Sequence, residues 1–198
     1  MATDVGAVLN NLLRFYQFED KIMLSVGAGG GQFAGYARVA SKVIAVDTDP
    51  AALVALLDRA RQLGIGDRFV LVQADFMAVK ERAEVVLFEF ALHEIPDPGT
   101  ALAHAASLAP DVVVIDHAPG SPWAHVVDET EKVAAAWEAI AARAVRRTES
   151  YDTFQRFATY RELFDKVKGQ GAEAIRRIER WRGCADITIP MSYRTALL

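Results

Sequence analysis

The chain has 198 residues, 52% of them hydrophobic, and a formal net charge of −4. This composition excludes an intrinsically disordered chain, and the small negative charge argues against a broad electrostatic surface for nucleic acid. A single cysteine excludes an intrachain disulfide framework and a multi-cysteine metal site. The N-terminus lacks the pattern of a signal peptide, and no apolar run reaches the length of a membrane span, so we expect a cytoplasmic protein of one domain.

The N-terminal third reads as helix, strand, helix and strand. Residues 4–18 show helical spacing of apolar side chains, with Asp4 as a plausible cap. An apolar run at 22–26 predicts a buried strand, which is followed by a glycine-rich turn and a short helix over 32–40. The next run, 42–46, predicts a second strand. Asp49 and Pro50 then begin a helix that ends near residue 62.

Three further apolar runs predict strands at 69–72, 85–88 and 112–115, and a helix over about 99–108 precedes the last of them. Short apolar strands that alternate with helices are typical of a parallel sheet with both faces covered. The sequence therefore predicts a doubly wound α/β domain.

The C-terminal part has a different pattern. Residues 122–147 and 151–168 each predict a helix, and glycines at 169 and 171 end the second one. Segments 173–182 and 187–198, on either side of Gly183, indicate an antiparallel hairpin at the edge of the sheet. The first of these two segments also has a near-helical spacing of apolar side chains.

The glycine-rich turn is the most informative motif. Gly27, Gly29 and Gly31 form a G-x-G-x-G pattern, which permits positive φ angles and lets a ligand approach the backbone. Asp47 ends the second predicted strand, twenty residues after Gly27, where a carboxylate can accept hydrogen bonds from ribose hydroxyls. A tight turn needs glycines even without a ligand, but the order strand, turn, helix, strand and acid favours a nucleoside cofactor.

Polar residues also follow the other predicted strands. In an open α/β sheet, ligands bind beyond the carboxyl ends of the strands. Those ends carry the glycines, Asp47, and the pairs Asp75-Phe76, Glu89-Phe90 and Asp116-His117.

These motifs resemble those of the class I S-adenosylmethionine-dependent methyltransferases, especially the small-molecule, methyltransferase type 11-like group. The likeness lies in residues 26–31, 45–47, 73–75 and 84–98, and it covers nearly all of the chain. It implies a Rossmann-like, mostly parallel seven-stranded sheet with a C-terminal antiparallel hairpin. The implied parts of the single domain, 1–198, are an N-terminal helix (1–20), a cofactor-binding core (21–118), a helical substrate-side segment (119–170) and a terminal hairpin (171–198).

The resemblance also implies roles for individual residues. The three glycines approach the methionine part of the cofactor, Asp47 holds the ribose with Thr48 beside it, and Asp75 meets the adenine amino group. The remaining implied contacts are Phe76 on the adenine ring, and Glu89 and Phe90 near the methionine or the sulfonium. Two positions depart from the pattern. Ser25 stands where the family usually has an acid, and Gln32 breaks the dinucleotide pattern G-x-G-x-x-G, which favours the methyl donor over NAD.

The implied reaction is a direct in-line displacement, and it needs a base only if the acceptor must lose a proton. His93 and His117, which follow the fourth and fifth strands, are the candidates for that base. His93 can equally be a capping or packing residue. We predict no metal site, since His93, His117 and Asp116 have no recognisable ligand spacing.

We therefore expect an S-adenosylmethionine-dependent methyltransferase that acts on a small molecule, which the sequence does not name. The alternatives are an NAD(P)-dependent oxidoreductase, another nucleotide-binding protein of Rossmann-like fold, and a non-catalytic cofactor-binding subunit. No nucleic-acid or membrane partner is expected, and a monomer and a homodimer both stay open.

Overall fold

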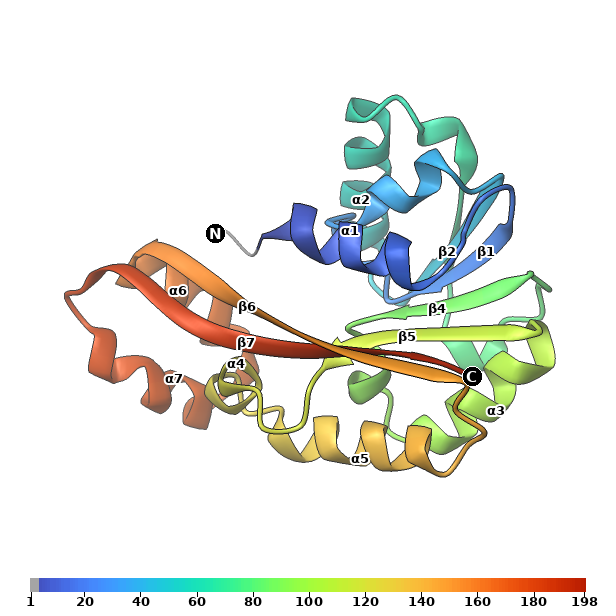
Figure 1. Cartoon of the computed structure of the whole chain (residues 1–198). Coiled ribbons are helices and arrows are strands. Elements are labelled where there is room, and N and C mark those ends of the chain that lie inside the picture. The colour runs from blue at the N-terminus through green and yellow to red at the C-terminus, as the bar shows by residue number, and fades with distance from the viewer. Residues whose placement is uncertain (1–3) are drawn as a thin grey trace.

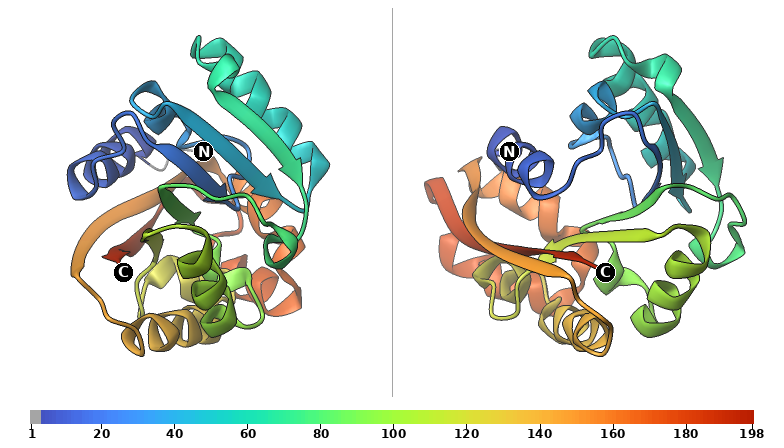
Figure 2. Two further views of the ribbon diagram at one scale, coloured as in Figure 1. Left: turned by 90° about the vertical axis from the view of Figure 1, so that its right-hand side faces the viewer. Right: turned by 45° about the vertical axis from the view of Figure 1, so that its right-hand side comes forward.

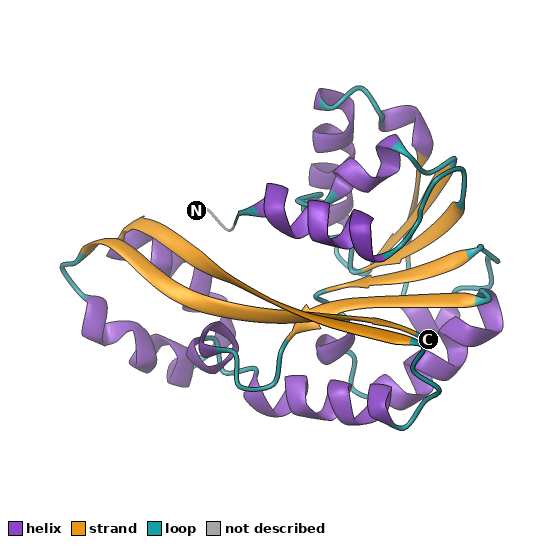
Figure 3. Ribbon diagram, viewed as in Figure 1, coloured by secondary structure: helices purple, strands orange, loops and turns teal. Residues whose placement is uncertain are grey.

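A seven-stranded sheet runs through the whole molecule and is flanked by helices on both faces (Figures 1 and 3). The computed structural model describes residues 4–198. Its strands are β1 (Ile22–Val26), β2 (Lys42–Asp47), β3 (Phe69–Gln73), β4 (Val85–Glu89), β5 (Asp111–His117), β6 (Arg147–Thr159) and β7 (Ala185–Leu197). Its α-helices are α1 (Val5–Phe15), α2 (Pro50–Gln62), α3 (Pro98–Leu108), α4 (Pro122–Val126), α5 (Thr130–Ala141), α6 (Tyr160–Val167) and α7 (Ala172–Ile178).

The strand order is β3-β2-β1-β4-β5-β7-β6. Strands β1 to β5 are parallel, whereas β7 is antiparallel to both of its neighbours. The chain moves outward from β1 to β3 and then returns to β4, so the order reverses between β1 and β4. A reversal of this kind leaves a crevice at the carboxyl ends of the strands. The expected Rossmann-like, mostly parallel sheet with an antiparallel hairpin is confirmed.

Alternate side chains of the strands supply two hydrophobic cores, one on each face. Met23, Val43 and Leu87 pack with α1 and α2, whereas Leu24, Ile44 and Phe88 pack with α3 and α5. The caps of the first two helices are as expected, because Asp4 accepts a hydrogen bond from the amide of Ala7 and Asp49 from that of Ala51. Across residues 4–198, no helix combines the length and hydropathy needed to traverse a lipid bilayer.

The prediction of a helical segment over 119–170 is wrong in its centre, where 147–159 forms β6. Tyr151, Phe154, Phe157 and Tyr160 recur every third residue, which imitates the spacing of a helix. Burial instead follows every second residue in this strand. The predicted helix over 122–147 is also divided, since Asp128 has a φ of +64° between α4 and α5.

The terminal hairpin is present, but its first strand is not the predicted one. Segment 173–182 forms α7 and a short 3-10 turn, in agreement with its near-helical spacing. Strand β7 pairs with β6 instead, from Arg147 opposite Leu197 to Thr159 opposite Ala185. The two strands of the hairpin are therefore joined by α6 and α7 and not by a tight turn at Gly183.

The β6–β7 hairpin extends far beyond the carboxyl ends of the parallel strands (Figures 1 and 2). The pairing of β7 with β5 covers residues 193–197 of β7 and ends where His117 faces Tyr193. Residues 185–192 then continue, paired only with β6, past the carboxyl end of β5. We call residues 185–192 of β7, together with the residues 152–159 of β6 that pair with them, the ribbon. Helices α6 and α7 lie beside it (Figure 1). The ribbon thus stands beside the crevice at the carboxyl ends of the parallel strands.

Candidate functional site

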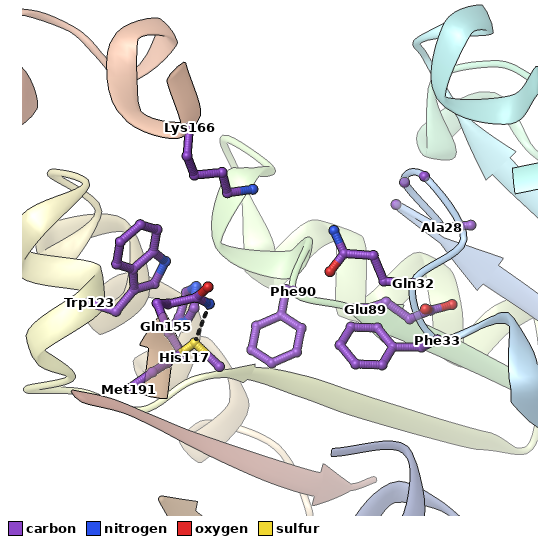
Figure 4. Close-up of a pocket in the computed structure, with 13 residues that line it drawn as sticks. Ala28, Gln32, Phe33, Glu89, Phe90, His117, Trp123, Gln155, Lys166 and Met191 are labelled. Carbon is purple, nitrogen blue, oxygen red and sulfur yellow. Dashed lines mark hydrogen bonds between the residues drawn. The ribbon is translucent and has the colours of Figure 1, made fainter. Parts of the chain in front are cut away.

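Two cavities adjoin each other at the carboxyl ends of the parallel strands. The first has a volume of about 340 Å³ and lies between the glycine turn and the ribbon (Figure 4). The second, of about 370 Å³, lies over the ends of β2 and β3. Gly27 and Phe90 line both cavities, so the two spaces meet at the ends of β1 and β4.

The glycine turn has the backbone that only glycine adopts easily. Gly27, Gly29 and Gly31 have φ angles of +68°, +48° and +73°. A Cβ atom on Gly27 would lie 2.3 Å from the Cβ of Ala91. Gly27 and Gly29 line the first cavity, whereas Gly31 packs against Leu56 of α2. The helix expected after the turn is only a 3-10 helix, Ala34–Arg38.

Asp47 lies at the end of β2 and lines the second cavity together with Thr48. Its Oδ2 accepts a hydrogen bond of 3.3 Å from the amide of Gly29, and its Oδ1 accepts one of 2.9 Å from the amide of Asp49. These amides fix a half-buried carboxylate at the junction of the glycine turn and α2.

Asp75 and Phe76 border the second cavity from the end of β3. Asp75 is exposed and caps a short turn by accepting a hydrogen bond of 2.8 Å from the amide of Met77. Phe76 is buried, and its ring meets the rings of Phe88 and His104 edge to face at centroid distances of 5.2 and 5.1 Å. Phe76 therefore lies in the cavity wall, with much of its ring held by packing.

Glu89 is a buried acid at the end of β4 and lines the first cavity. Its Oε1 accepts hydrogen bonds from the hydroxyls of Ser25 and Tyr36, the latter at 2.5 Å. Burial raises the pKa of Glu89 to about 7, although the two hydroxyl donors act in the opposite direction. Glu89 thus places an acid beside Ser25, the position where the family resemblance led us to expect one.

Tyr36 is a further residue of this site, which sequence reasoning missed. It lies in the 3-10 helix after the glycine turn and is completely buried. The available signal was a large polar-tipped side chain between two small residues, Gly35 and Ala37, soon after the glycine turn.

Phe90 has a φ of +50°, which is rare for a residue with a side chain. Its ring stacks on Phe33 at a centroid distance of 5.8 Å and lies 4.9 Å from the ring of His117. Backbone strain of this kind costs about 1–2 kcal/mol. This backbone conformation places the ring of Phe90 where the two cavities meet.

His117 is the last residue of β5 and lines the first cavity. Its Nδ1 is buried and has no hydrogen-bond partner among residues 4–198. Its Nε2 lies 3.9 Å from Oε2 of Glu129, beyond hydrogen-bond distance. Burial lowers the pKa of His117 to about 4, and the Asp116 carboxylate offsets this only in part, so the imidazole is neutral at neutral pH.

His93 lines neither cavity and is held by acids. Its Nδ1 lies 2.6 Å from Oδ1 of Asp116. Burial alone would lower the pKa of His93, but the hydrogen bond to Asp116 and the carboxylates of Glu129 and Glu94 outweigh burial and raise it to about 11. A cation buried in this way is poorly placed to accept a proton from a ligand.

The far wall of the first cavity comes from the ribbon and the helices around it (Figure 4). Trp123 of α4, Gln155 of β6, Lys166 of α6 and Met191 of β7 line it. In Figure 4, the amino group of Lys166 points across the cavity toward Gln32. Trp123 was one of the aromatic residues that the sequence offered for such a pocket. Sequence reasoning missed Gln155, Lys166 and Met191, because it did not recognise β6 and the ribbon.

Comparisons with known proteins agree with this geometry. Residues 24–113 match the family described as methyltransferase domain. No protein of curated function matches the chain.

Solved structures resemble the chain over nearly its whole length. A candidate methyltransferase from Bacillus halodurans is 14% identical with a TM-score of 0.71, over 97% of this chain and 98% of that one. The YcgJ protein of Bacillus subtilis is 13% identical with a TM-score of 0.68, over 97% and 96%. Magnesium protoporphyrin IX methyltransferase from Synechocystis, solved with bound S-adenosylmethionine, is 13% identical with a TM-score of 0.57, over 96% and 77%. At these identities, the likeness shows the fold.

Proposed function

We propose that the chain is a class I S-adenosylmethionine-dependent methyltransferase and that it methylates a small anionic molecule held in the first cavity, a proposal supported by the match of residues 24–113 to the family described as methyltransferase domain. The observation that carries this proposal is the meeting of the two cavities at Gly27 and Phe90. One cavity is bordered by the acids of β2 and β3, and the other opens toward a cationic, partly apolar wall.

The residues around the second cavity fit the nucleoside part of S-adenosylmethionine. The Asp47 carboxylate is fixed by two amides and suits ribose hydroxyls, which donate hydrogen bonds. Asp75 stands at the rim, where it can accept from an exocyclic amino group. A Cβ on Gly30 would meet nothing within 4 Å, so the backbone of the turn is open to a ligand.

Glu89 suits the methionine end of the cofactor. Among residues 4–198 it is the one carboxylate that lines the first cavity, and the ends of β1 and the glycine turn adjoin it. A buried carboxylate gains most from a cationic partner, and the methionine part carries an ammonium group. We assign to Glu89 the hold on this ammonium that an acid at position 25 would otherwise provide.

When bound, S-adenosylmethionine supplies a methyl group that is already activated for displacement by its positive sulfur. The protein's task is therefore to orient the acceptor and to exclude water. Phe33, Phe90, Trp123 and Met191 offer apolar contacts for the body of the acceptor. Lys166 offers a cation that forms no ion pair within residues 4–198, and this supports an acceptor with a carboxylate or phosphate group.

His117 has a more limited role than a strong general base. Its low pKa makes it a weak proton acceptor at neutral pH. The ring nevertheless lines the first cavity, where an imidazole can hydrogen-bond a hydroxyl or amine of the acceptor. We propose that His117 orients the acceptor, and we assign no proton transfer to His93.

A screen of methyl acceptors tests the proposed function. The full chain is incubated with S-adenosylmethionine and with small carboxylates, phosphates and matched neutral esters, and release of S-adenosylhomocysteine is measured. Turnover is expected with anionic acceptors, and Lys166→Met should remove the preference for them. Equal turnover of acids and esters would contradict the role of Lys166. Tight binding of S-adenosylhomocysteine without turnover of any acceptor would favour a non-catalytic subunit.

Replacement of Asp47 by Ala should weaken S-adenosylhomocysteine binding by about 10- to 100-fold, because a charged acceptor of ribose hydrogen bonds is lost. Isothermal titration calorimetry measures the affinity. Asp58→Ala is the matched control, since Asp58 lies on the exposed side of α2, where it pairs with Arg61. Equal affinities of the two variants would remove Asp47 from the site.

Replacement of His117 by Asn should lower kcat/KM for methyl transfer by about tenfold and leave the affinity for S-adenosylhomocysteine within about twofold. The loss reflects a misoriented acceptor, so KM should rise more than kcat falls. His125→Asn, in the exposed part of α4, serves as the control. A variant that loses cofactor affinity instead would place His117 against the cofactor.

A further inference from the structure

A second constellation of titratable side chains lies beside the first cavity and is not used by the proposed reaction, apart from His117 at its border. It consists of His93 and Glu94 from the turn after β4, Asp116 and His117 from the end of β5, and Glu129 immediately before α5. We call it the histidine–carboxylate cluster. All of these residues except Glu94 are buried.

The distances in the cluster are those of ligands that share an ion. Nε2 of His93 lies 3.5 Å from Oε1 of Glu94 and 3.5 Å from Oε2 of Glu129, and one ligand atom from each of the three residues lies within 4.8 Å of the others. Good hydrogen bonds between nitrogen and oxygen are shorter, at about 2.7–3.2 Å. Two ligand atoms at about 2.0–2.1 Å from a tetrahedral metal lie about 3.3 Å apart. The two distances from Nε2 of His93 are therefore closer to those between ligands of one ion than to those of good hydrogen bonds.

Asp116 sets the state of the His93 ring. Its Oδ1 lies 2.6 Å from Nδ1 of His93, and Asp116 also accepts hydrogen bonds from the backbone amides of His93 and His117. A metal ion that displaces the proton of Nε2 would meet a lone pair on the side of Glu94 and Glu129, while Asp116 holds the proton that stays on Nδ1. A carboxylate behind a histidine in this way is the usual support of a metal-binding imidazole.

The charge of the cluster also calls for a cation. Glu94 is paired with Lys132 at 2.7 Å, but within residues 4–198 the buried carboxylates of Asp116 and Glu129 form ion pairs only with histidines. Of the described residues, His93 is the one cation beside these two buried carboxylates, so one buried negative charge stays unbalanced, which is costly. His117 adds a buried ring whose Nε2 faces Glu129 and whose Nδ1 has no partner in the described part of the chain.

We propose that the histidine–carboxylate cluster binds one divalent transition-metal ion, with His93, Glu94 and Glu129 as ligands and His117 beside the remaining coordination position. One imidazole and two carboxylates are ligands that suit zinc or manganese better than the softer or the purely oxygen-bound metals. The ion would join the turn after β4 to the start of α5. This inference does not depend on the identity of the methyl acceptor.

Titration of the full chain with zinc chloride, after treatment with EDTA, tests the proposal. We expect one zinc ion per chain by calorimetry, together with a higher melting temperature. Glu129→Gln and His93→Gln should each weaken zinc binding by at least about tenfold, and Asp116→Asn by about 10- to 100-fold through loss of the support for His93. Glu131→Gln, an exposed residue in the first turn of α5, should bind zinc like the parent.

Two results would overturn the proposal. One is the absence of stoichiometric binding of zinc or manganese by the parent. The other is equal binding by Glu129→Gln and Glu131→Gln, which would assign the ion to the surface. Circular dichroism and S-adenosylhomocysteine binding check that each variant is folded. If His93→Gln does not fold, Glu129→Gln alone decides, because glutamine keeps the size of the side chain and removes its charge.

Discussion

Replacement of Glu89 by Gln should weaken S-adenosylhomocysteine binding by about 100-fold and at the same time stabilise the protein at pH 8. The loss of affinity follows from the assigned contact, since a hydrogen bond between a buried carboxylate and an ammonium contributes about 1.5–3 kcal/mol. The introduced glutamine keeps a carbonyl oxygen that can accept from the hydroxyls of Ser25 and Tyr36, so the packing of the site is preserved.

The gain in stability follows from the pKa of Glu89, which is about 7 in the folded protein against an ordinary value of 4.5. A raised pKa means that the folded state favours the protonated acid. The resulting stabilisation is complete below pH 4.5 and is lost as the pH rises through 7. At pH 8 the parent therefore carries a buried charge that the glutamine variant lacks, a difference on the order of 3 kcal/mol. Urea unfolding at pH 5 and pH 8 should show the advantage of the variant growing across this range.

The same pKa predicts how cofactor affinity depends on pH. An ammonium binds the ionised form of Glu89, so the parent should bind S-adenosylhomocysteine about tenfold more weakly at pH 6 than at pH 8. The Glu89→Gln variant should show a flat profile over this range. Glu81→Gln, an exposed acid before β4, is the control for general effects of charge. If the affinity of the glutamine variant also changed with pH, another group would be changing its protonation state when the ligand binds.

Replacement of Gly27 by Ala should abolish cofactor binding and cost about 3 kcal/mol of stability. The added Cβ would lie 2.3 Å from the Cβ of Ala91, and the φ of +68° is unfavourable for alanine. Overpacking and left-handed backbone each cost roughly 1–3 kcal/mol. To avoid this clash, either the glycine turn or Ala91 must move, and both lie at the cavities.

Gly169→Ala is the matched control for this change, because its Cβ would meet nothing within 4 Å and Gly169 lines neither cavity. Urea unfolding and calorimetry should show near-parental stability and affinity for Gly169→Ala, and lower stability without cofactor binding for Gly27→Ala. Similar behaviour of the two variants would mean that the turn adapts and that its backbone is not what holds the ligand.

The parallel half of the fold was predictable because its elements depend on local patterns. The apolar runs of β1 to β5 are short and bounded by glycines, prolines or acids, so each strand and its polar end were identified. The residues at those ends, such as Asp47, Glu89 and His117, consequently lie at the cavities. The identity of the cofactor, by contrast, was inferred from the family resemblance.

The antiparallel half was not predictable from local patterns. In β6, the aromatics Tyr151, Phe154 and Phe157 have the period of a helix, and only pairing with β7 reveals that alternate residues are buried. Lys166 and Glu129 reach their sites through the placement of α6 and of the turn at Asp128. Neither position has a sequence signal, because both depend on contacts between segments far apart in the chain.

In the proposed function, the reach of the ribbon past β5 assigns the binding of the donor and of the acceptor to different parts of the chain. The matched methyltransferase region, 24–113, supplies the glycine turn and the acids, whereas Trp123, Gln155, Lys166 and Met191 all lie after it. If this proposal holds, changes in the later segment alter which molecule is methylated and leave the binding of the donor unchanged. Exchanging residues 119–192 between relatives of this fold should transfer acceptor preference with the exchanged piece, since the donor side is built entirely by the part that stays.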